Sequence, residues 1–466
     1  MSSPRHTAPQ LTRDAIAAKT GFFGHPWGLA YISATQAWDS FSYYGMQSLL
    51  VLYMVRQLLT PGHIENVLGF GPFADALQMV YGPLSGQPLA SAITGVYAAL
   101  VFGTPILGGL VADWLLGRTR TVVIGCVLMT LGHFMMAFEA SFLTALLCIV
   151  IGTGCAACLK AQVGALYELN DPRRADAFQL FLLGLTIAVI FSPIVCGYLG
   201  EKVAWHWGFG AAGIGMLIGL MIYLSGLRYL PPEAIKRKAE DGPQRAKLTS
   251  TEWRTVGLLV LLLPVFALAA VGNMEIFNGY LVWGDQNFEL EFFGEIMPVS
   301  WLLSLDAFVS VICIALSMAF WRWFGSKWRE PDEITKAGIG AAIAALAPLI
   351  LAAASLLAMN GHKVGLVWGL SFHIVNDIGF SNVYPIGMAL YSRAAPPSLG
   401  ATVVSAYSLT LFLANLIVAK LAGLLASLPA AVFWSLHAGL VAGAAVVMLI
   451  CAWAFRKSLS PSATAS

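Results

Sequence analysis

The sequence has little charge, and it lacks the motifs of soluble hydrolytic or ATP-driven proteins. Only 11% of its 466 residues are charged, against roughly 25% in soluble domains, and 58% are hydrophobic. It contains no Walker-type G-x-x-x-x-G-K-[ST] and no H-E-x-x-H, so nothing supports ATP-driven pumping or zinc proteolysis. The net charge of +2 gives no argument for nucleic-acid binding. The composition excludes a soluble fold, and any active transport would have to draw on a gradient.

Cysteines form no pattern that suggests redox or metal chemistry. The seven cysteines are scattered, and only Cys155 and Cys158 make a C-x-x-C. Because this pair stands in an apolar run rich in small residues, we interpret it as helix packing. We expect no metal and no cofactor, and we do not expect an enzyme.

Apolar runs of about 20 residues, the length that crosses a bilayer, are what the sequence has in abundance. They lie at 27–54, 89–113, 121–139, 142–166, 177–200, 207–229, 255–281, 299–323, 337–359, 364–391, 402–427 and 430–454. They predict an all-α membrane protein of twelve transmembrane helices. The polar start, MSSPRHTAPQ, lacks the apolar region of a signal peptide, so we expect a cytoplasmic tail there.

Lysine and arginine set the expected orientation. If both termini are cytoplasmic, most of the 26 Lys and Arg residues fall on the inner side, and Arg56, Lys202 and Lys363 fall outside. The polar segment 231–254 divides the chain into two sets of six spans, which is typical of transporters with a site between two bundles. The expected organisation is a tail at 1–26, a six-helix bundle at 27–230, a cytoplasmic linker at 231–254, a second bundle at 255–455 and a tail at 456–466.

A glycine-rich motif with charges follows the second span. It reads G-G-L-V-A-D-W-L-L-G-R-T-R from Gly108 to Arg120. Its glycines allow close helix contact, and Asp113 with Arg118 and Arg120 can form a charged latch at the cytoplasmic side. The alternative is that the arginines only set topology. The pattern resembles the signature of the major facilitator superfamily.

The first span carries a more specific motif. Residues 35–47 read T-Q-A-W-D-S-F-S-Y-Y-G-M-Q and resemble the E-x-x-E-R-F-x-Y-Y-G motif of the proton-dependent oligopeptide transporter family. The matching residues are Phe41, Tyr43, Tyr44 and Gly45. Residues 159–176 continue the likeness. The resemblance implies a major facilitator fold and proton-driven uptake of small peptides by alternating access.

The departures from the family motif concern its charges. Gln36, Asp39 and Ser40 stand where the family has two glutamates and an arginine, so the proton-coupling cluster is only partly present. The family's lysine in the fourth span is kept as Lys160, and we expect Asp39 to be its partner because a lone ammonium in hydrocarbon is costly. The alternative is that Lys160 snorkels or bonds to backbone carbonyls.

The positions that would hold the two ends of a peptide are also changed. The helix 1 arginine aligns with Gln47, and the asparagine of helix 5 aligns with Thr186. Phe380 stands where the amine-binding glutamate of helix 10 should be. These changes argue against an ordinary dipeptide as the substrate.

Acidic residues nevertheless remain in the second half. Asp377 lies one turn before Phe380, and His373 lies four residues before Asp377 on the same face. Asp306 occupies the place of the family's helix 8 asparagine. Glu275 lies close to the family's helix 7 glutamate, in a stretch that ends at Asn278. Each acid has an alternative reading: His373 and Asp377 could be a structural pair, and Glu275 could stay protonated.

The candidate site consists of two sets of residues. For proton coupling we expect Asp39, Lys160, Glu275 and Asp377. For substrate binding we expect Gln36, Tyr43, Tyr44, Gln47, Lys160, Thr186, Glu275, Asn278, Asp306, Asp377, Phe380 and Tyr407. The motif places the aromatic members Tyr43 and Tyr44, and Tyr407 stands where the family usually has a tryptophan.

The sequence therefore predicts a proton-coupled importer of small peptides or peptide-like solutes. A relative that carries a non-peptide, amine-bearing or otherwise modified solute, with altered or absent coupling, is the alternative within transporters. An intramembrane enzyme using His373, Asp377 and Asp306 lacks a nucleophile or metal cluster, and a non-transporting receptor is the remaining rival. The expected partners are a small-molecule substrate, protons and the lipid bilayer, with no nucleic acid. We expect a functional monomer in the plasma (inner) membrane.

Overall fold

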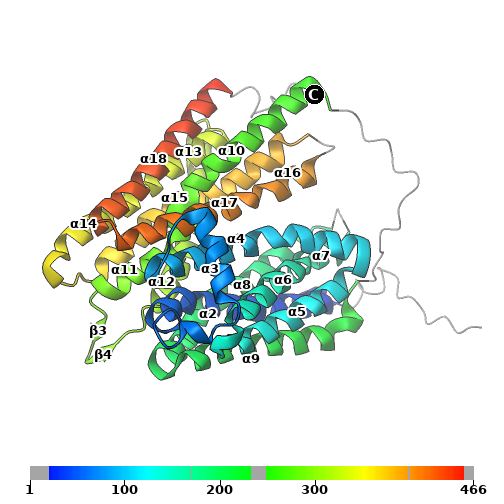
Figure 1. Ribbon diagram of the computed structural model, residues 1–466. Helices are drawn as coiled ribbons and strands as arrows, with labels where there is room; N and C mark the ends of the chain where they lie inside the picture. Colours follow the sequence, from blue (N-terminus) through cyan, green and yellow to red (C-terminus); the bar gives the residue numbers. More distant parts are fainter. Residues whose placement is uncertain (1–19, 169–170, 232–247, 397–398, 456–466) are drawn as a thin grey trace, which may run out of the picture.

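The structure is a computed structural model that describes residues 20–168, 171–231, 248–396 and 399–455 (Figure 1). Most of the predicted tails and linker lies outside the described residues. The helices of the first half are α2 (Trp27–Tyr53), α3 (Phe70–Tyr81), α4 (Gly86–Val111), α5 (Arg118–Met135), α6 (Phe142–Ala156), α7 (Cys158–Ala165), α8 (Arg173–Tyr198) and α9 (Trp205–Gly226). Those of the second half are α10 (Ser250–Met274), α11 (Gly279–Asn287), α12 (Trp301–Lys327), α13 (Glu333–Ala344), α14 (Leu346–Leu357), α15 (Val367–Ala394), α16 (Gly400–Tyr407), α17 (Leu409–Leu421) and α18 (Ala430–Ala454).

Short elements finish or join these helices. Two antiparallel hairpins pair β1 (Thr20–Phe22) with β2 (His25–Pro26) and β3 (Glu291–Phe292) with β4 (Glu295–Ile296). Wider π-helical turns occur at Met54–Leu58, Ala112–Leu116 and Leu199–Val203. Single 3₁₀ turns occur at Ile64–Asn66, Glu139–Ser141, Leu227–Tyr229, Glu275–Phe277, Met359–Gly361 and Ala422–Ala426.

Nine helical stretches of the described chain are long and apolar enough to cross a membrane. Three more long helices, α2, α5 and α15, stand at the other three predicted spans but are outside that set. They are more polar: α2 carries Gln36, Asp39 and Gln47, and α15 carries His373 and Asp377. These helices carry many of the predicted site residues, and the same polar residues lower the mean hydropathy of the helices.

The span that begins with α10 is broken before it continues in α11. A capping box starts α10, where the Thr249 hydroxyl accepts from the Glu252 N–H at 3.3 Å and the Glu252 carboxylate accepts from the Thr249 N–H at 2.7 Å. The helix then ends at Met274, and Asn278, with φ −134° and ψ −105°, separates it from α11. Breaks in the middle of a span are tolerated where the backbone lines a cavity or is covered by protein.

The helices form two groups that meet along one interface. We call α2 to α9 the first group and α10 to α18 the second group; they occupy the lower and upper parts of Figure 1. In the first group α2 packs against α8 and α9, and in the second group α13 packs against α15 and α18. The two groups touch mainly through α4 against α17 and α8 against α12.

Two glycines of the 108–120 motif, Gly108 and Gly117, have a structural role that a residue with a side chain could not easily take. A Cβ on Gly108 would lie 1.9 Å from the carbonyl oxygen of Gly154, so the approach of α4 to α6 requires glycine there. Gly117 adopts φ +78°, which L residues with a side chain rarely adopt, and it turns the chain into α5 at Arg118. The prediction of close helix contact is confirmed at Gly108, whereas a Cβ on Gly109 would meet nothing within 4 Å.

Hydrogen bonds between the two groups gather at one end of the molecule. We call it the Arg56 end, because Arg56 contacts Asp285 of the second group there. The Glu201 carboxylate accepts from the backbone N–H groups of Val299 and Ser300 at 3.1 and 2.9 Å. Further bonds there are Trp301 to Ile194, Gln87 to Ala422, Lys420 to Tyr81 and Tyr81 to Leu416. In Figure 1 the ribbons of the two groups diverge toward the opposite end, where α10 and α16 begin.

Candidate functional site

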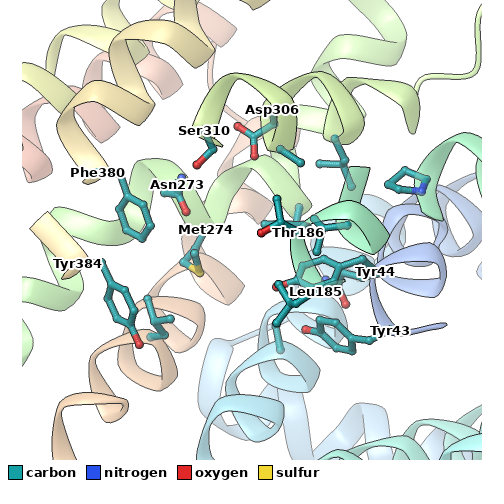
Figure 2. A pocket seen from close by; sticks show the side chains of 18 of the residues that line it. Tyr43, Tyr44, Leu185, Thr186, Asn273, Met274, Asp306, Ser310, Phe380 and Tyr384 are labelled. Atoms are coloured by element: carbon teal, nitrogen blue, oxygen red, sulfur yellow. The ribbon is translucent and has the colours of Figure 1, made fainter. Parts of the chain in front are cut away.

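A cavity of about 400 Å³ lies between the two groups. Its wall combines residues of α2, α4 and α8 from the first group with residues of α10, α12, α15 and α17 from the second group. Figure 2 shows Tyr43, Tyr44 and Thr186 on one side, facing Asp306, Ser310, Phe380 and Tyr384 across the space. The volume falls within the roughly 300–1,000 Å³ of small-molecule sites.

The first-group part of the wall contains four predicted residues. They are Tyr43, Tyr44, Gln47 and Thr186. The rings of Tyr43 and Tyr44 stand edge to face with centroids 5.0 Å apart, and they present two hydroxyls to a mainly apolar space. Gln47 also lines the cavity, although it is only 2% exposed.

The second-group part of the wall contains one carboxylate. Asp306 lines the cavity, and its Oδ1 lies 2.8 Å from Nδ1 of the buried His373. Phe380 also lines it and stacks on Tyr384 with ring centroids 5.8 Å apart. The aromatic pair therefore fills the place where the resemblance expects an amine-binding glutamate.

The charge of the cavity wall is one-sided. Among the described residues that line it, Asp306 is the one carboxylate, and no lysine or arginine takes part. The other polar groups are tyrosine and serine hydroxyls, the Thr186 hydroxyl, and the amides of Gln47, Asn273 and Asn415. A bound cation would meet a charged partner here, whereas a bound carboxylate would meet neutral donors.

Asp39 and Lys160 do not form the expected ion pair in this conformation. Gln36 donates to Asp39 Oδ2 at 3.0 Å and to the Ser40 hydroxyl at 3.1 Å, and Asp39 Oδ1 is buried without a hydrogen-bond partner among the described residues. Lys160 lies on an exposed face of α7. The helix break at Ala157 separates α7 from α6 and sets the direction of this face. Gln36, Asp39 and Lys160 are not part of the cavity wall.

Glu275 is placed in a buried pair rather than in the cavity. Its side chain is fully buried, Oε2 lies 3.2 Å from His437 Nε2, and Oε1 accepts from the Gly279 N–H at 3.0 Å. Asn278 points toward the first group and donates to the Ser91 carbonyl at 3.0 Å. Because the 3₁₀ turn at Glu275–Phe277 rotates the chain, the cavity receives Asn273, Met274 and Phe277 in place of Glu275 and Asn278.

Asp377 and Tyr407 also lie outside the cavity wall. Tyr407 is fully buried against Phe266 and Tyr384, so it packs within the second group. Asp377 accepts from its neighbour Asn376 at 3.3 Å. The alternative that His373 pairs with Asp377 is wrong for this conformation, because His373 bonds instead to Asp306 on α12 and to Tyr280 on α11.

Comparisons with known proteins agree with this geometry. Residues 119–251 match the family model described as the POT family. The chain is 27% identical over 474 residues to the uncharacterized transporter YclF of Bacillus subtilis (strain 168), covering 89% of this chain and 91% of that protein. It is 28% identical over 442 residues to a di-/tripeptide transporter of Lactococcus lactis subsp. cremoris, covering 80% and 84%.

A solved structure extends the likeness to nearly the whole chain. The crystal structure of a peptide transporter POT in complex with sulfate matches with a TM-score of 0.81 at 23% identity, covering 95% of this chain and 98% of that chain. This chain has the fold of the POT family transporters. The prediction of an all-helical fold like that of the POT family transporters is confirmed at that level.

Within this POT fold, the motif charges lie at the end opposite Arg56. Arg118 lies 3.8 Å from Asp113, and both side chains are more than a third exposed. Arg120 is exposed. In the turn before α8, Arg173 donates to Asp171 at 3.2 and 2.8 Å, and these bonds lower the pKa of the Asp171 carboxyl. The described contact of Asp113 with Arg118 joins two parts of the same group, and the latch between groups stays a prediction.

The sequence reasoning missed polar and aromatic residues of the cavity wall, among them Asn273, Phe277, Ser310, Tyr384 and Asn415. Ser310 lies one turn after Asp306, and Tyr384 lies one turn after Phe380, so a helical-face argument from these two predicted residues could have found them. Nothing in the sequence pointed to Asn415.

Proposed function

We propose that this protein is a proton-coupled secondary transporter that imports small peptides or peptide-like solutes by alternating access. One observation carries the proposal: a ligand-sized cavity has walls from both helix groups, while hydrogen bonds between the groups gather at the Arg56 end. Rocking of one group against the other would expose such a cavity to each side in turn. The di-/tripeptide transporter and peptide transporter among its relatives support the solute class.

The proposal includes the full membrane topology. We infer twelve spans, of which α2, α5 and α15 are the three polar ones, with both termini cytoplasmic and a monomer in the plasma (inner) membrane. The Arg56 end would then be external, because Arg56 belongs to the few basic residues expected outside. The described conformation would face inward. The two six-helix bundles would correspond to 27–230 and 255–455.

Proton coupling is assigned to Asp39 with Lys160, and to the acids of the second group. Oδ1 of Asp39 is buried and has no bonded partner among the described residues, and Oδ2 accepts from a neutral donor, Gln36. A carboxylate kept in hydrocarbon without a cation is costly, so binding a proton stabilises it. Lys160 would approach Asp39 in another conformation of the cycle.

A second candidate is a transporter of an amine-bearing solute that is not an ordinary peptide. The observation that favours it is the charge of the cavity wall, with Asp306 and no basic residue among its described members. Phe380 and Tyr384 add a stacked aromatic surface for the rest of such a molecule. The two candidates share the fold and differ in which end of the solute is held.

Counterflow in proteoliposomes tests the proposed function. Vesicles loaded with unlabelled dialanine or its amide should take up the labelled compound without any gradient. An inward pH gradient should then drive accumulation above the outside concentration. A protein that binds both compounds but exchanges neither is a receptor, and that result would overturn the proposal.

A further inference from the structure

The second group contains a buried chain of three polar side chains that ends in the cavity. Asp306 of α12 lines the cavity, and its Oδ1 lies 2.8 Å from His373 Nδ1 of α15. His373 Nε2 lies 2.8 Å from the hydroxyl of Tyr280 of α11. The His373 side chain is fully buried, whereas that of Asp306 is 12% exposed. A proton could therefore enter this chain from the cavity through Asp306.

The bonding partners of His373 allow it to gain a proton without losing a bond. Neutral His373 can donate through Nδ1 to the Asp306 carboxylate and accept the Tyr280 hydroxyl proton at Nε2. When Nε2 binds a proton, it becomes a donor, and the Tyr280 oxygen can accept because a hydroxyl serves both roles. The heavy atoms need not move between the two states.

His437, the other buried histidine with a carboxylate partner, lacks this freedom. Its Nδ1 lies 2.8 Å from the Phe433 carbonyl, which only accepts, so Nδ1 must carry a hydrogen. Its Nε2 faces Glu275 Oε2, and a good bond there needs one proton shared between the two groups. In this conformation that pair holds its proton, because losing it would leave two acceptors facing each other in a fully buried place.

The charges around His373 favour an added proton. The titratable groups that bond to His373 are Asp306 of α12 and Tyr280 of α11. Nearby, Cys313 of α12 bonds to the carbonyl of Ile374, and Asp377 lies one turn after His373 on α15. On the other helices packed against α15, α14 has no titratable side chain, and the charged residues of α10 and α13 lie within their first five residues. On α16 the titratable residue is Tyr407, which packs against Phe266 and Tyr384. Among the described residues, Asp306 has no ion pair except with His373, and Asp377 has none. Two carboxylates without a lysine or arginine are stabilised by an extra proton.

We propose that Asp306, His373 and Tyr280 form the proton-binding site of the second group, open to the substrate cavity through Asp306. The inference rests on the proposed transport function and names groups for its coupling. One proton leaves the cavity water, is taken up by the imidazole of His373, and returns to cavity water after the groups have rocked. With the added proton on the imidazole, the Asp306 carboxylate stays charged and can bind a solute ammonium at the same time, so proton and solute cross together.

The test separates solute exchange from coupling in the full-length protein. Proteoliposomes receive the wild type, His373→Gln, Tyr280→Phe or the control His133→Gln, which replaces a buried histidine of α5 that is outside the cavity wall. Counterflow of labelled dialanine and its amide reports binding and rocking. Accumulation under an inward gradient of about one pH unit reports coupling, with a limit of about tenfold per proton.

We expect His373→Gln to keep counterflow within about twofold of wild type and to lose gradient-driven accumulation, whereas His133→Gln keeps both. If His373→Gln accumulates solute as the wild type does, the proposal is overturned. If His373→Gln loses counterflow as well, Tyr280→Phe decides: reduced accumulation with intact counterflow supports the site, and full accumulation overturns it. A wild type that exchanges neither compound overturns the proposed function itself, and this inference with it.

Discussion

Arg56 Nε donates to Asp285 Oδ2 at 3.1 Å and thereby ties the turn after α2 to α11 of the other helix group. The same guanidinium donates to Glu201 at 3.1 Å, and Glu201 in turn accepts from the N–H groups of Val299 and Ser300. Arg56 and the buried carboxylate of Glu201 thus join four segments: the turn after α2, the turn after α8, α11 and the residues just before α12. This cluster closes the Arg56 end, so its strength should set how often that end opens.

Replacing Asp285 by asparagine should increase opening of the Arg56 end. Both partners are about a third exposed, so the contact is worth at most about 1 kcal/mol and the open population should rise about twofold to fivefold. Hydrogen exchange at Val299 and Ser300 measures this directly, because their N–H groups bond across the interface. Asp75→Asn, at an exposed acid of α3, is the control and should change nothing. Equal exchange rates in Asp285→Asn and wild type would show that the ion pair does not hold this end.

A second prediction concerns the contact of α4 with α17. A Cβ on Gly95 would lie 2.5 Å from Ala419 Cα and 2.7 Å from its backbone nitrogen, which cannot rotate away. Gly95→Ala should therefore destabilise the closed contact by roughly 1–3 kcal/mol and raise exchange at Ser300 by about fivefold to a hundredfold. Gly109→Ala is the matched control on the same helix, since its Cβ would meet nothing within 4 Å. If both variants behave alike, helix propensity rather than packing explains the effect.

Much of the fold could be predicted because a bilayer fixes the length of each apolar run. The runs at 142–166 and 430–454 agree closely with the α6–α7 span and with α18. What the sequence did not reveal is short: α3, with 12 residues, is below the length of a span, and the β3–β4 hairpin has two residues per strand. Neither carries the apolar run on which the prediction depended.

The candidate site could be predicted where a motif fixed the helical face. Tyr43 and Thr186 reached the cavity because their motif positions carried over, whereas Glu275 did not, since the helix breaks beside it. His373 on α15 and Asp306 on α12 bond to each other although they lie 67 residues apart in the sequence. Spacing along α15 favoured Asp377 as the partner of His373, but such spacing gives no information on which neighbouring helix lies closest to His373.

Asp39→Asn should uncouple solute uptake from the proton gradient. The buried Oδ1 of Asp39 has no bonded partner among the described residues, and an amide there cannot bind a proton reversibly. Accumulation of labelled dialanine or its amide under a pH gradient should fall to the outside concentration, while counterflow continues. Asp176→Asn, at an exposed acid in the first turn of α8, should leave both measurements unchanged. Accumulation that survives in Asp39→Asn would remove this residue from the coupling pathway.

The last prediction follows from the one-sided charge of the cavity. Because its described wall holds Asp306 but no basic residue, the amine of a solute should dominate binding. Dialanine amide should therefore bind about as well as dialanine, whereas N-acetyl dialanine should bind weakly. Asp306→Asn should weaken binding of both amine-bearing compounds by roughly 1.5–3 kcal/mol, about tenfold to a hundredfold, through loss of a charge-assisted hydrogen bond.

Thermal stabilisation of the purified protein by each compound measures these affinities, because a ligand that binds only the folded state raises its melting temperature. Asp75→Asn serves again as the control, since Asp75 lies outside the cavity wall. The converse variant, Gln47→Arg with Phe380→Glu, supplies both charges that the resemblance expects and should move the preference toward unmodified dialanine. Tight binding of dialanine by the native protein, lost on amidation of its carboxylate, would contradict this account, because it requires a cation in the cavity that the described wall does not contain.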